Sequence, residues 1–155
     1  MIEENVHMRQ KGIIDAAKLH MPILIIGAGS IGGWTALALS KLGCSNITVM
    51  DGDTVEEHNA GSQIFKVSDA GEQKVHALAD KLSLLTELPL ERGIPVHWDA
   101  KNEEHNQSLK EYPIVIAAVD NITVRAQLFE VLKNSDSLYI DARMAGNALE
   151  IYTVR

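Results

Sequence analysis

The stretch that decides the fold reads ILIIGAGSIG and covers residues 23–32. Its first four residues, Ile23–Ile26, are all apolar, which is typical of a short strand buried on both faces of a parallel sheet. Gly27, Gly29 and Gly32 follow in the spacing GxGxxG and open a helical pattern. In such a turn the first glycine permits the tight bend, the second lets the backbone approach a phosphate, and the third lets the helix pack closely on the strand. The stretch therefore predicts a nucleotide-binding strand–turn–helix unit, and the structural alternative is a merely tight turn.

The rest of the chain continues the alternation of strand and helix. Further strands are expected at Ile47–Met50, Ile94–Trp98, Ile114–Val119, Leu138–Ile140 and Leu149–Val154. Helices are expected over 4–19, 30–42, 72–88, 102–110 and 122–132. This order predicts one α/β domain, residues 1–155, in which helices cover both faces of a doubly wound, mainly parallel sheet. The last strand is expected at an edge of the sheet, and residues 1–20 are expected to form an N-terminal helical arm.

Three of the expected helices carry apolar residues at helical spacing. The stripes are Ile31, Trp34, Ala38 and Leu42; Val75, Leu78, Leu82 and Leu85; and Ile122, Ala126, Phe129 and Leu132. An apolar stripe of this kind usually faces the core, so each is expected to pack against the sheet.

Composition and charge narrow the class of protein. The chain has 155 residues, 46% of them hydrophobic and 23% charged, which is typical of a globular domain. A net charge of −7 argues against a nucleic-acid-binding module, which usually needs a basic face. The single cysteine, Cys44, cannot form an internal disulfide and, beside Leu42 and Ile47, is expected to be a small core residue. No apolar run approaches the roughly 20 residues of a membrane helix, so we expect a cytoplasmic protein without a membrane partner.

Asp51 is a second candidate for nucleotide binding, after the glycine turn. It closes the second strand about 20 residues after the glycines, where a carboxylate commonly accepts hydrogen bonds from ribose hydroxyls. The glycines and Asp51 fit ATP and NAD equally well. They identify a nucleotide and leave its chemistry open.

The residues that follow the second strand resemble the ThiF/MoeB/HesA family, the bacterial relatives of ubiquitin-activating enzymes. That family carries a pattern near D-x-D-x-V-E-x-x-N-L-x-R-Q and then G-x-x-K. The matching positions here are Asp51, Asp53, Val55, Glu56, Asn59 and Gln63, followed by Gly71 and Lys74. The family also has an aspartate and an asparagine after the fourth strand, an arginine four residues later, and an N-terminal Arg-Gln pair. These are matched by Asp120, Asn121, Arg125, Arg9 and Gln10.

The resemblance implies a Rossmann-like domain that uses ATP and Mg²⁺ to adenylate the C-terminal carboxylate of a ubiquitin-like protein or peptide. It implies that Lys74 contacts the triphosphate, that Asp120 holds Mg²⁺ and that Asp51 binds the ribose. By the same resemblance the remaining nucleotide-site residues are Gly27, Gly29, Gly32, Asp53, Asn59 and Gln63, and Asn59 helps to orient the phosphates. Arg9 would act in catalysis with Lys74 and Asp120, and in the family such an arginine often comes from the other subunit of a dimer.

Each of these roles has a structural alternative. Lys74 at a helix start is otherwise a solvated surface lysine, and Asp120 otherwise caps the following helix. Asp53 otherwise stabilises its own loop through side-chain-to-backbone bonds. Arg125 otherwise pairs with a carboxylate as a clamp, and Arg9 otherwise belongs to a mobile terminus.

Two departures from the family pattern bear on activity. Ser62 stands where the family has arginine, and Ala60 where it has leucine; a serine cannot supply a fixed cation. The chain also lacks the family's paired CxxC zinc ligands and its loop with a reactive cysteine, so we expect neither zinc nor thioester chemistry. Either another cation replaces the arginine, or the chain is a non-catalytic ThiF-like subunit of a heteromeric activating enzyme. An NAD-binding oxidoreductase domain is the third reading, and it leaves Asn59, Lys74 and Asp120 unexplained.

Two smaller features complete the expectations. The alternating last strand, from Leu149 to Val154, is expected to expose a sheet edge that pairs with another chain, which predicts a homodimer or heterodimer. The six histidines show no paired metal-ligand spacing, and His58 is the one placed in the loop of the family pattern.

Overall fold

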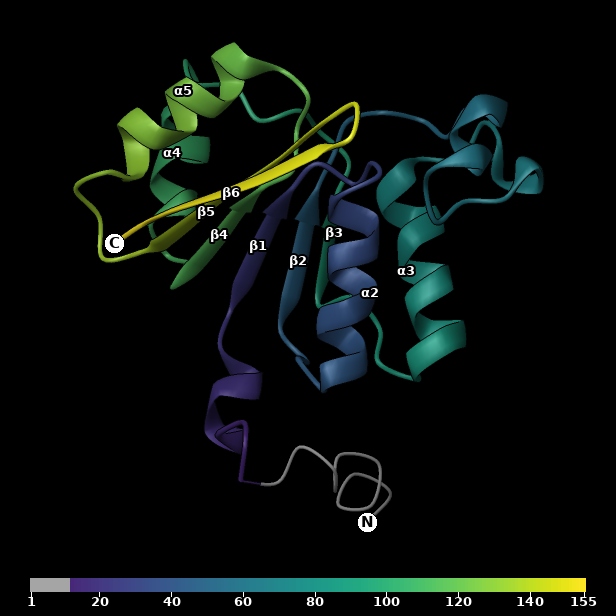
Figure 1. Ribbon diagram of the computed structural model, residues 1–155, viewed down its shortest axis with the longest axis horizontal. Helices are drawn as coiled ribbons and strands as arrows, with labels where there is room; N and C mark the ends of the chain where they lie inside the picture. The colour runs from purple at the N-terminus through teal and green to yellow at the C-terminus, as the bar shows by residue number, and fades with distance from the viewer. Residues whose placement is uncertain (1–11) are drawn as a thin grey trace.

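The computed structural model of the chain describes residues 12–155. Within this range one six-stranded sheet has the strand order β3-β2-β1-β4-β5-β6 (Figure 1). The strands are β1 (Ile23–Ile26), β2 (Ile47–Met50), β3 (Arg92–Ile94), β4 (Ile114–Ala117), β5 (Leu138–Ala145) and β6 (Ala148–Val154). Strands β1 to β5 pair in parallel, and β6 pairs antiparallel with β5 at the edge. The structure confirms the mainly parallel α/β sheet with a C-terminal edge strand.

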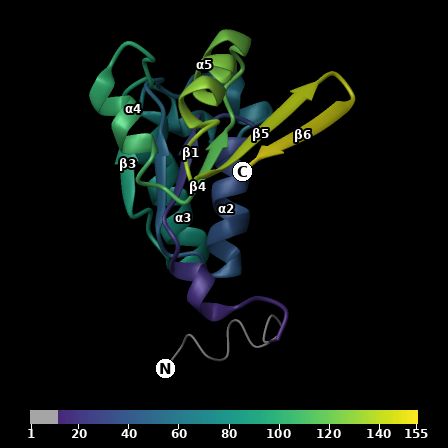
Figure 2. The ribbon, with the colours of Figure 1, turned by 90° about the vertical axis from the view of Figure 1, so that its left-hand side faces the viewer.

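Helices cover both faces of the sheet, as expected. The α-helices are α2 (Gly32–Leu42), α3 (Lys74–Thr86), α4 (Glu103–Leu109) and α5 (Ile122–Leu132). Short 3-10 helices are η2 (Ala16–His20), η3 (Glu57–Gly61) and η4 (Val67–Asp69). Helices α2 and α3 lie on one face and α4 and α5 on the other (Figures 1 and 2). No helix of residues 12–155 has both the length and the apolar composition needed to cross a bilayer.

The expected N-terminal helix, residues 4–19, is absent over residues 12–15, and its first part, residues 4–11, lies outside the described residues. Of residues 12–20, only Ala16–His20 are helical, and they form the 3-10 turn η2. The Asp15 side chain caps this turn by accepting a hydrogen bond from the Ala17 N–H. Pro22 follows closely, and a proline disfavours helical geometry at the residue before it.

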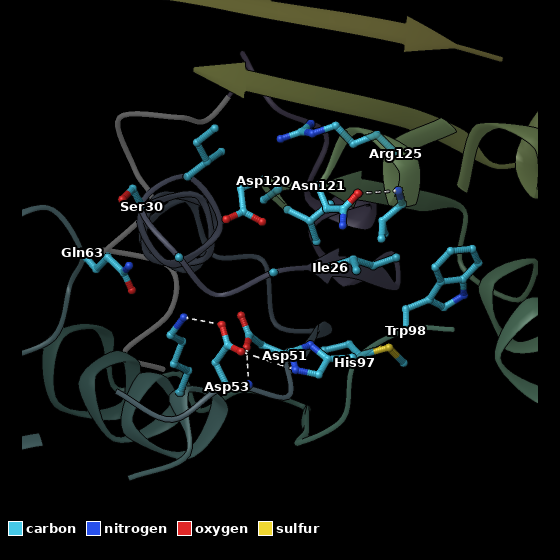
Figure 3. Close-up of a pocket in the computed structure, with 18 of the residues that line it drawn as sticks. Ile26, Ser30, Asp51, Asp53, Gln63, His97, Trp98, Asp120, Asn121 and Arg125 are labelled. Carbon is cyan, nitrogen blue, oxygen red and sulfur yellow. Dashed lines mark hydrogen bonds and ion pairs between the residues drawn. The ribbon is translucent and has the colours of Figure 1, made fainter. Parts of the chain in front are cut away.

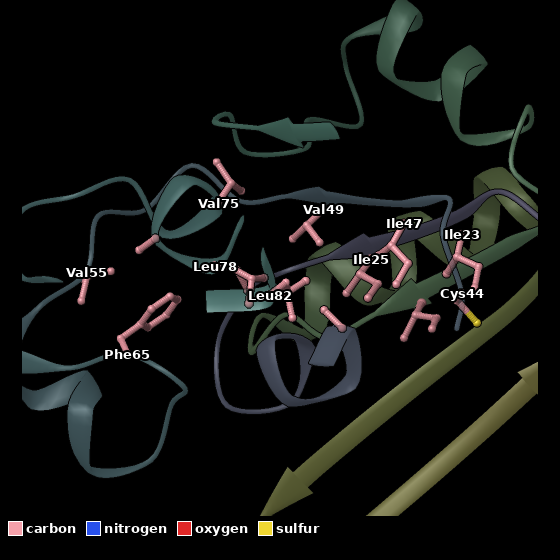
Figure 4. Close-up of a cluster of buried hydrophobic side chains, with 14 residues drawn as sticks. Ile23, Ile25, Cys44, Ile47, Val49, Val55, Phe65, Val75, Leu78 and Leu82 are labelled. Carbon is pink, nitrogen blue, oxygen red and sulfur yellow. The ribbon is translucent and has the colours of Figure 1, made fainter. Parts of the chain in front are cut away.

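Two apolar clusters, one on each face, form the core. All four residues of β1 are buried, and because side chains alternate along a strand they serve both clusters. On the first face Ile25 and Val49 pack against Leu78 and Leu82 of α3 (Figure 4). Cys44 belongs to this cluster, and burial raises the pKa of its thiol, in agreement with a core role. The second cluster contains Leu24, Ile26, Met50, Trp98, Leu109, Val115, Ala117, Leu128, Leu132 and Tyr139.

Helix α2 does not pack through its apolar stripe. The residues it buries are Gly32, Gly33, Ala36 and Ser40, whereas Trp34 is 49% exposed and Leu42 36% exposed. The helix lies so close to the glycine turn that a Cβ atom on Gly32 would be 1.8 Å from the Gly27 carbonyl oxygen. Small residues therefore face the sheet, Trp34 and Leu42 point outward, and Leu37 and Leu39 are partly buried against the core. In α3 the expected stripe is buried at Val75, Leu78 and Leu82, while Leu85 is exposed.

Helix α5 is likewise rotated from the expected orientation. It buries Arg125, Leu128 and Leu132, whereas Ile122 is 62% exposed and Phe129 38% exposed. The Arg125 side chain reaches the buried carboxylate of Asp141 on β5. Arg125 is thus buried on the same face of α5 as Leu128 and Leu132, and its ion pair with Asp141 offsets part of the cost of burying both charges.

Strand β3 ends earlier than expected, and β5 ends later. Pro95 has no N–H to donate to a neighbouring strand, so β3 covers Arg92–Ile94 instead of Ile94–Trp98. Trp98 is nevertheless buried, from the loop that follows. Strand β5 continues to Ala145 and joins β6 through a turn in which Gly146 has a φ of 58°, a conformation that favours glycine.

Candidate functional site

A cavity of about 670 Å³ opens at the carboxyl ends of β1, β2 and β4 (Figure 3). Strands β1 and β4 are neighbours, but β1 leads to α2 on one face and β4 leads to α5 on the other. Open α/β sheets bind ligands at such a switch point. The lining includes Gly27, Gly29, Ser30, Asp51, Asp53, Gln63, Lys74, His97, Trp98, Asp120, Asn121, Arg125 and Met144.

Each of the three glycines has its own steric role at the cavity. Gly27 has a φ of 100°, and an added Cβ would lie 2.7 Å from the Ala118 carbonyl oxygen. An added Cβ on Gly32 would collide with the backbone of the same turn. At Gly29 the nearest atom to an added Cβ is Nε2 of Gln63, 4.0 Å away. Gly29 therefore leaves its backbone open to the cavity, where a ligand can approach it closely.

The start of α2 offers unused hydrogen-bond donors. Ile31 precedes the helix and provides no side-chain cap. The backbone N–H groups of Gly29, Ser30 and Ile31 have no acceptor among residues 12–155. Free N–H groups together with the helix dipole make such a helix start an anion-binding site.

The Asp51 side chain links the end of β2 to the glycine turn through a hydrogen bond. Its carboxylate is buried, and Oδ2 accepts a hydrogen bond of 2.6 Å from the Ala28 N–H. Its Oδ1 accepts one of 2.8 Å from the Asp53 N–H. Asp51 also lines the cavity, so it holds the turn in shape at the position where a ribose is expected.

Asp53, Lys74 and His97 form a polar group on one wall of the cavity. Lys74 Nζ lies 2.7 Å from Asp53 Oδ2, and His97 Nε2 lies 3.4 Å from Asp53 Oδ1. The Asp53 carbonyl also accepts a hydrogen bond from the Lys74 backbone N–H at 2.9 Å. Asp53 therefore holds both the backbone and the side chain of Lys74. Lys74 is only 8% exposed, which excludes the alternative of a solvated surface lysine. Asp53 does more than stabilise its own loop, because it pairs with Lys74.

His97 and Trp98 line the cavity although the sequence analysis did not single them out. The reason is the misplaced strand: residues expected inside β3 lie in the loop beyond its carboxyl end. Pro95 is the signal that could have revealed this, since it ends the strand pairing just before them.

Asp120 points into the cavity from the end of the β4 segment (Figure 3). The cap of α5 is Asn121, whose side-chain oxygen accepts from the N–H groups of Thr123 (2.9 Å) and Val124 (3.3 Å). The alternative that Asp120 caps the helix is therefore wrong. Asp120 is exposed, and its carboxylate makes no hydrogen bond or ion pair within residues 12–155.

A free carboxylate of this kind suits Mg²⁺, which prefers oxygen ligands and retains several waters. Among residues 12–155 no group of three or more His, Cys, Asp or Glu side chains is placed to hold a metal ion. One protein carboxylate together with nucleotide phosphates nevertheless satisfies the preferences of Mg²⁺.

Arg125 also lines the cavity (Figure 3). Its Nη1 donates to Oδ1 of Asp141, and Arg143 donates to Oδ2 of the same carboxylate. The clamp considered for Arg125 is therefore present. Burial and the Asp141 carboxylate raise the pKa of the adjacent Tyr139 to about 12.

The other expected site residues lie in different surroundings. Gln63 lines the cavity, and its Oε1 is buried without a partner. Asn59 is buried outside the cavity lining, where its Oδ1 accepts from the Glu56 N–H at 2.9 Å. Its expected contact with phosphates stays a prediction. Ser62 is exposed and accepts a hydrogen bond of 3.3 Å from the Ser30 hydroxyl, and Arg9 lies outside the described residues.

Comparisons with known proteins agree with this architecture. The chain matches the model of the ThiF family over residues 11–154. The "Adenylyltransferase and sulfurtransferase MOCS3-1" of Zea mays is 32% identical over 104 residues, which are 66% of this chain and 22% of that protein. The "Ubiquitin-like modifier-activating enzyme ATG7" of Candida glabrata is 31% identical over 123 residues, 76% of this chain and 19% of that protein.

Solved structures share the fold. PaaA superposes with a TM-score of 0.79 at 23% identity, over 99% of this chain and 50% of that one. The E. coli tRNA N6-threonylcarbamoyladenosine dehydratase TcdA, solved with ATP, gives 0.82 at 21% identity, over 95% and 62%. The chain thus spans about a fifth of the curated relatives and half to three-fifths of the matched structures. Because the family model extends over nearly its whole length, the chain belongs to the ThiF family.

Proposed function

We propose that this chain is the nucleotide-binding domain of an ATP-dependent adenylyltransferase that activates the C-terminal carboxylate of a ubiquitin-like protein or peptide. The observation that carries the proposal is the meeting of three features in one cavity: free N–H groups at the glycine turn, the buried ammonium of Lys74, and the unpaired carboxylate of Asp120. The names of the two relatives, an adenylyltransferase and a ubiquitin-like modifier-activating enzyme, support this class of reaction. The ATP complexes of TcdA and E. coli MccB support the choice of nucleotide.

The chemistry explains these residue types. A carboxylate oxygen attacks the α-phosphorus of ATP, the bond to the β-phosphate oxygen breaks, and pyrophosphate leaves, which yields an acyl-adenylate. Two anions must come together, so the site needs donors and cations where negative charge accumulates. The N–H groups of Gly29, Ser30 and Ile31 would bind phosphate oxygens, and Lys74 would do so after giving up part of its contact with Asp53. Asp51 would place the ribose.

Asp120 would hold Mg²⁺ at the phosphates. When bound, the ion offsets negative charge on the triphosphate and on the departing pyrophosphate. The structural support is that the Asp120 carboxylate faces the cavity and has no other partner among residues 12–155, while Asn121 performs the capping.

A partner chain is part of the proposal. Strand β6 is an outer strand of the sheet, and one face of the β5–β6 hairpin exposes Met144, Leu149 and Ile151. An open edge beside an apolar face favours association. We infer a homodimer or heterodimer, through which a cation such as Arg9 would reach the neighbouring cavity.

The direct test is ATP–pyrophosphate exchange with Mg²⁺ and a peptide or ubiquitin-like protein ending in Gly-Gly. Wild type should exchange, and Asp120→Ala and Lys74→Met should each reduce the rate by about 100-fold, because each removes a charge contact in the reacting site. Asp136→Ala and Lys110→Met are matched controls, since both residues are exposed and outside the cavity lining. Equal rates in the site variants and in wild type would refute the proposal.

Ser62 favours a second candidate, a subunit that binds nucleotide without adenylating. Its hydroxyl, hydrogen-bonded to Ser30 beside the glycine turn, cannot replace a guanidinium. This candidate predicts ATP binding with no exchange in wild type or in Asp120→Ala. Thermal stability with ATP·Mg²⁺ compared with NAD separates both candidates from an oxidoreductase domain, because a ligand that binds the folded state raises its stability.

A further inference from the structure

Two arginines share one buried carboxylate beside the cavity. Asp141 is 3% exposed, and its Oδ1 accepts from Nη1 of Arg125. Its Oδ2 accepts from Nε of Arg143 at 2.9 Å and from Nη2 of the same side chain. Two positive charges therefore face a single negative one, and Arg125 itself is only 6% exposed. A buried cation that is not fully compensated is costly unless another anion joins it.

A second acid, Glu150, lies opposite Arg143 in the β5–β6 pairing and acts on that arginine, not on Arg125. The Tyr139 hydroxyl donates to the Arg125 carbonyl at 3.3 Å, and a neutral phenol carries no charge. Glu150 is exposed on the hairpin and accepts its hydrogen bond from Tyr152 at 2.8 Å. Asp120, in the same cavity, forms no ion pair with Arg125. Among residues 12–155, Arg125 therefore has Asp141 as its one ionic partner and shares it with Arg143.

The guanidinium of Arg125 also has nitrogen donors without an acceptor. Its Nη1 serves Asp141 and, at 3.4 Å, the Ala117 carbonyl. Its Nε and Nη2 have no acceptor within residues 12–155, and neither is sealed from solvent. Arg125 lines the cavity whereas Arg143 does not, so Nε and Nη2 of Arg125 are unused donors at the cavity (Figure 3).

We propose that Arg125 binds an oxyanion in this cavity and so supplies the cation that Ser62 does not. Asp141 is then a positioning residue, because it pins one nitrogen of the guanidinium and leaves the others aimed at the ligand. A guanidinium held in this way binds carboxylate or phosphate oxygens through parallel donors with little reorganisation. The inference rests on the proposed function for the source of the oxyanion, which is either a phosphate of ATP or the attacking carboxylate.

The test compares Arg125→Lys with Arg143→Lys. Both variants keep the charge and a contact with Asp141, but the lysine at 125 loses the additional donors. Arg125→Lys is expected to weaken an oxyanion contact by about tenfold, whereas Arg143→Lys, outside the cavity, should leave it unchanged. The melting temperatures of both variants show whether a loss comes from unfolding.

Three probes distinguish the two sources of the oxyanion. Weaker binding of ATP and AMP to Arg125→Lys, measured by calorimetry, assigns a phosphate. Unchanged ATP binding, with a tenfold higher requirement for a Gly-Gly peptide acid in the exchange assay, assigns the carboxylate. Either result supports the inference. Equal behaviour of Arg125→Lys and wild type toward ATP, AMP and the peptide acid overturns it.

A measurement on the wild-type protein separates this inference from the proposed function. The Nε–H signal of Arg125 in an NMR spectrum should move when AMP, inorganic phosphate or the peptide acid is added. If wild type does not bind ATP but this signal moves with phosphate, the adenylation proposal fails and the oxyanion site stands. If ATP binds and the signal moves with none of AMP, inorganic phosphate and the peptide acid, the oxyanion site is refuted and the nucleotide proposal stands.

Discussion

Exchanging single glycines of the turn for alanine separates what the turn does for the fold from what it does for the ligand. An alanine methyl at Gly32 would lie 1.8 Å from the Gly27 carbonyl oxygen. A methyl at Gly29 would find nothing nearer than Nε2 of Gln63 at 4.0 Å. Gly32→Ala should therefore damage folding, and Gly29→Ala should spare folding but occupy the space through which a phosphate approaches.

The magnitudes follow from these contacts. A carbon normally stays about 3.3 Å from a carbonyl oxygen, so the turn must open by about 1.5 Å to admit the methyl at position 32. The clash is with backbone, and overpacking of this kind costs about 3 kcal/mol. For a domain of this size that loss lowers the melting temperature by roughly 6–12 °C. Gly29→Ala should shift it by less than about 2 °C while weakening ATP binding by about 10- to 100-fold, the value of a charge-assisted hydrogen bond.

Thermal unfolding and calorimetric titration with ATP·Mg²⁺ on wild type and both variants complete the experiment. The reasoning requires opposite profiles: low stability for Gly32→Ala, and normal stability with weak binding for Gly29→Ala. A stable Gly32→Ala protein would show that α2 does not lie as close to the turn as described. Normal ATP affinity in Gly29→Ala would show that the phosphates do not approach this backbone.

Three further predictions concern charge and association. Asp69 and Lys81 form an ion pair of 2.6 Å; burial alone raises the pKa of Asp69, but a backbone N–H and the Lys81 ammonium outweigh it and lower the pKa. The pair therefore stabilises the protein above about pH 4, and its contribution falls as the pH drops through the lowered pKa. Lys81→Met should lower the free energy of unfolding in urea by about 2 kcal/mol at pH 7 and by little near pH 2. An equal loss at both pH values would contradict this. Burial, and next the Asp141 carboxylate, raises the pKa of Tyr139 to about 12. In an ultraviolet titration, the tyrosine signal that Tyr139→Phe removes should therefore still be un-ionised at pH 11. The contribution of Tyr139 to stability is present below pH 10 and lost as the pH rises through about 12. Ile151→Lys on the exposed face of β6 should shift light scattering of micromolar protein toward monomer, and a wild-type monomer would refute the inferred association.

Much of the fold was predictable because its signals are local. The apolar run of β1 and the glycine spacing after it depend on neighbouring residues, and the structure has both where expected. The caps of α4 and α5 are of the same kind, since Asn102 and Asn121 accept from N–H groups two or three residues ahead. Such contacts have the same geometry wherever the segment lies.

Helix orientation was not predictable in this way. The apolar stripes of α2 and α5 were expected to face the sheet, yet Trp34 and Ile122 are exposed. In α2 close approach to the turn selects small residues, and α5 buries Leu128 and Leu132 on the face from which Arg125 pairs with Asp141. Gly33 of α2 also lies close to Ile64, and Arg125 reaches Asp141, so these contacts join residues distant in sequence.

Some residues of the candidate site could be found from the sequence, and others only from the structure. The resemblance in the sequence named Asp51, Lys74 and Asp120, and the structure brings them to one cavity. It did not reveal His97, which a shortened strand places in a loop, or the shared carboxylate of Asp141.

By itself, the sequence determined the order of strands and helices along the chain, the glycine turn and the family, because periodicity and motif spacing are properties of adjacent residues. The tertiary structure alone decided which helix faces are buried and that Arg125 and Arg143 share one carboxylate. Those outcomes depend on distances between segments that the chain brings together only when the sheet forms, and burial then makes each unpaired charge or misplaced methyl group costly.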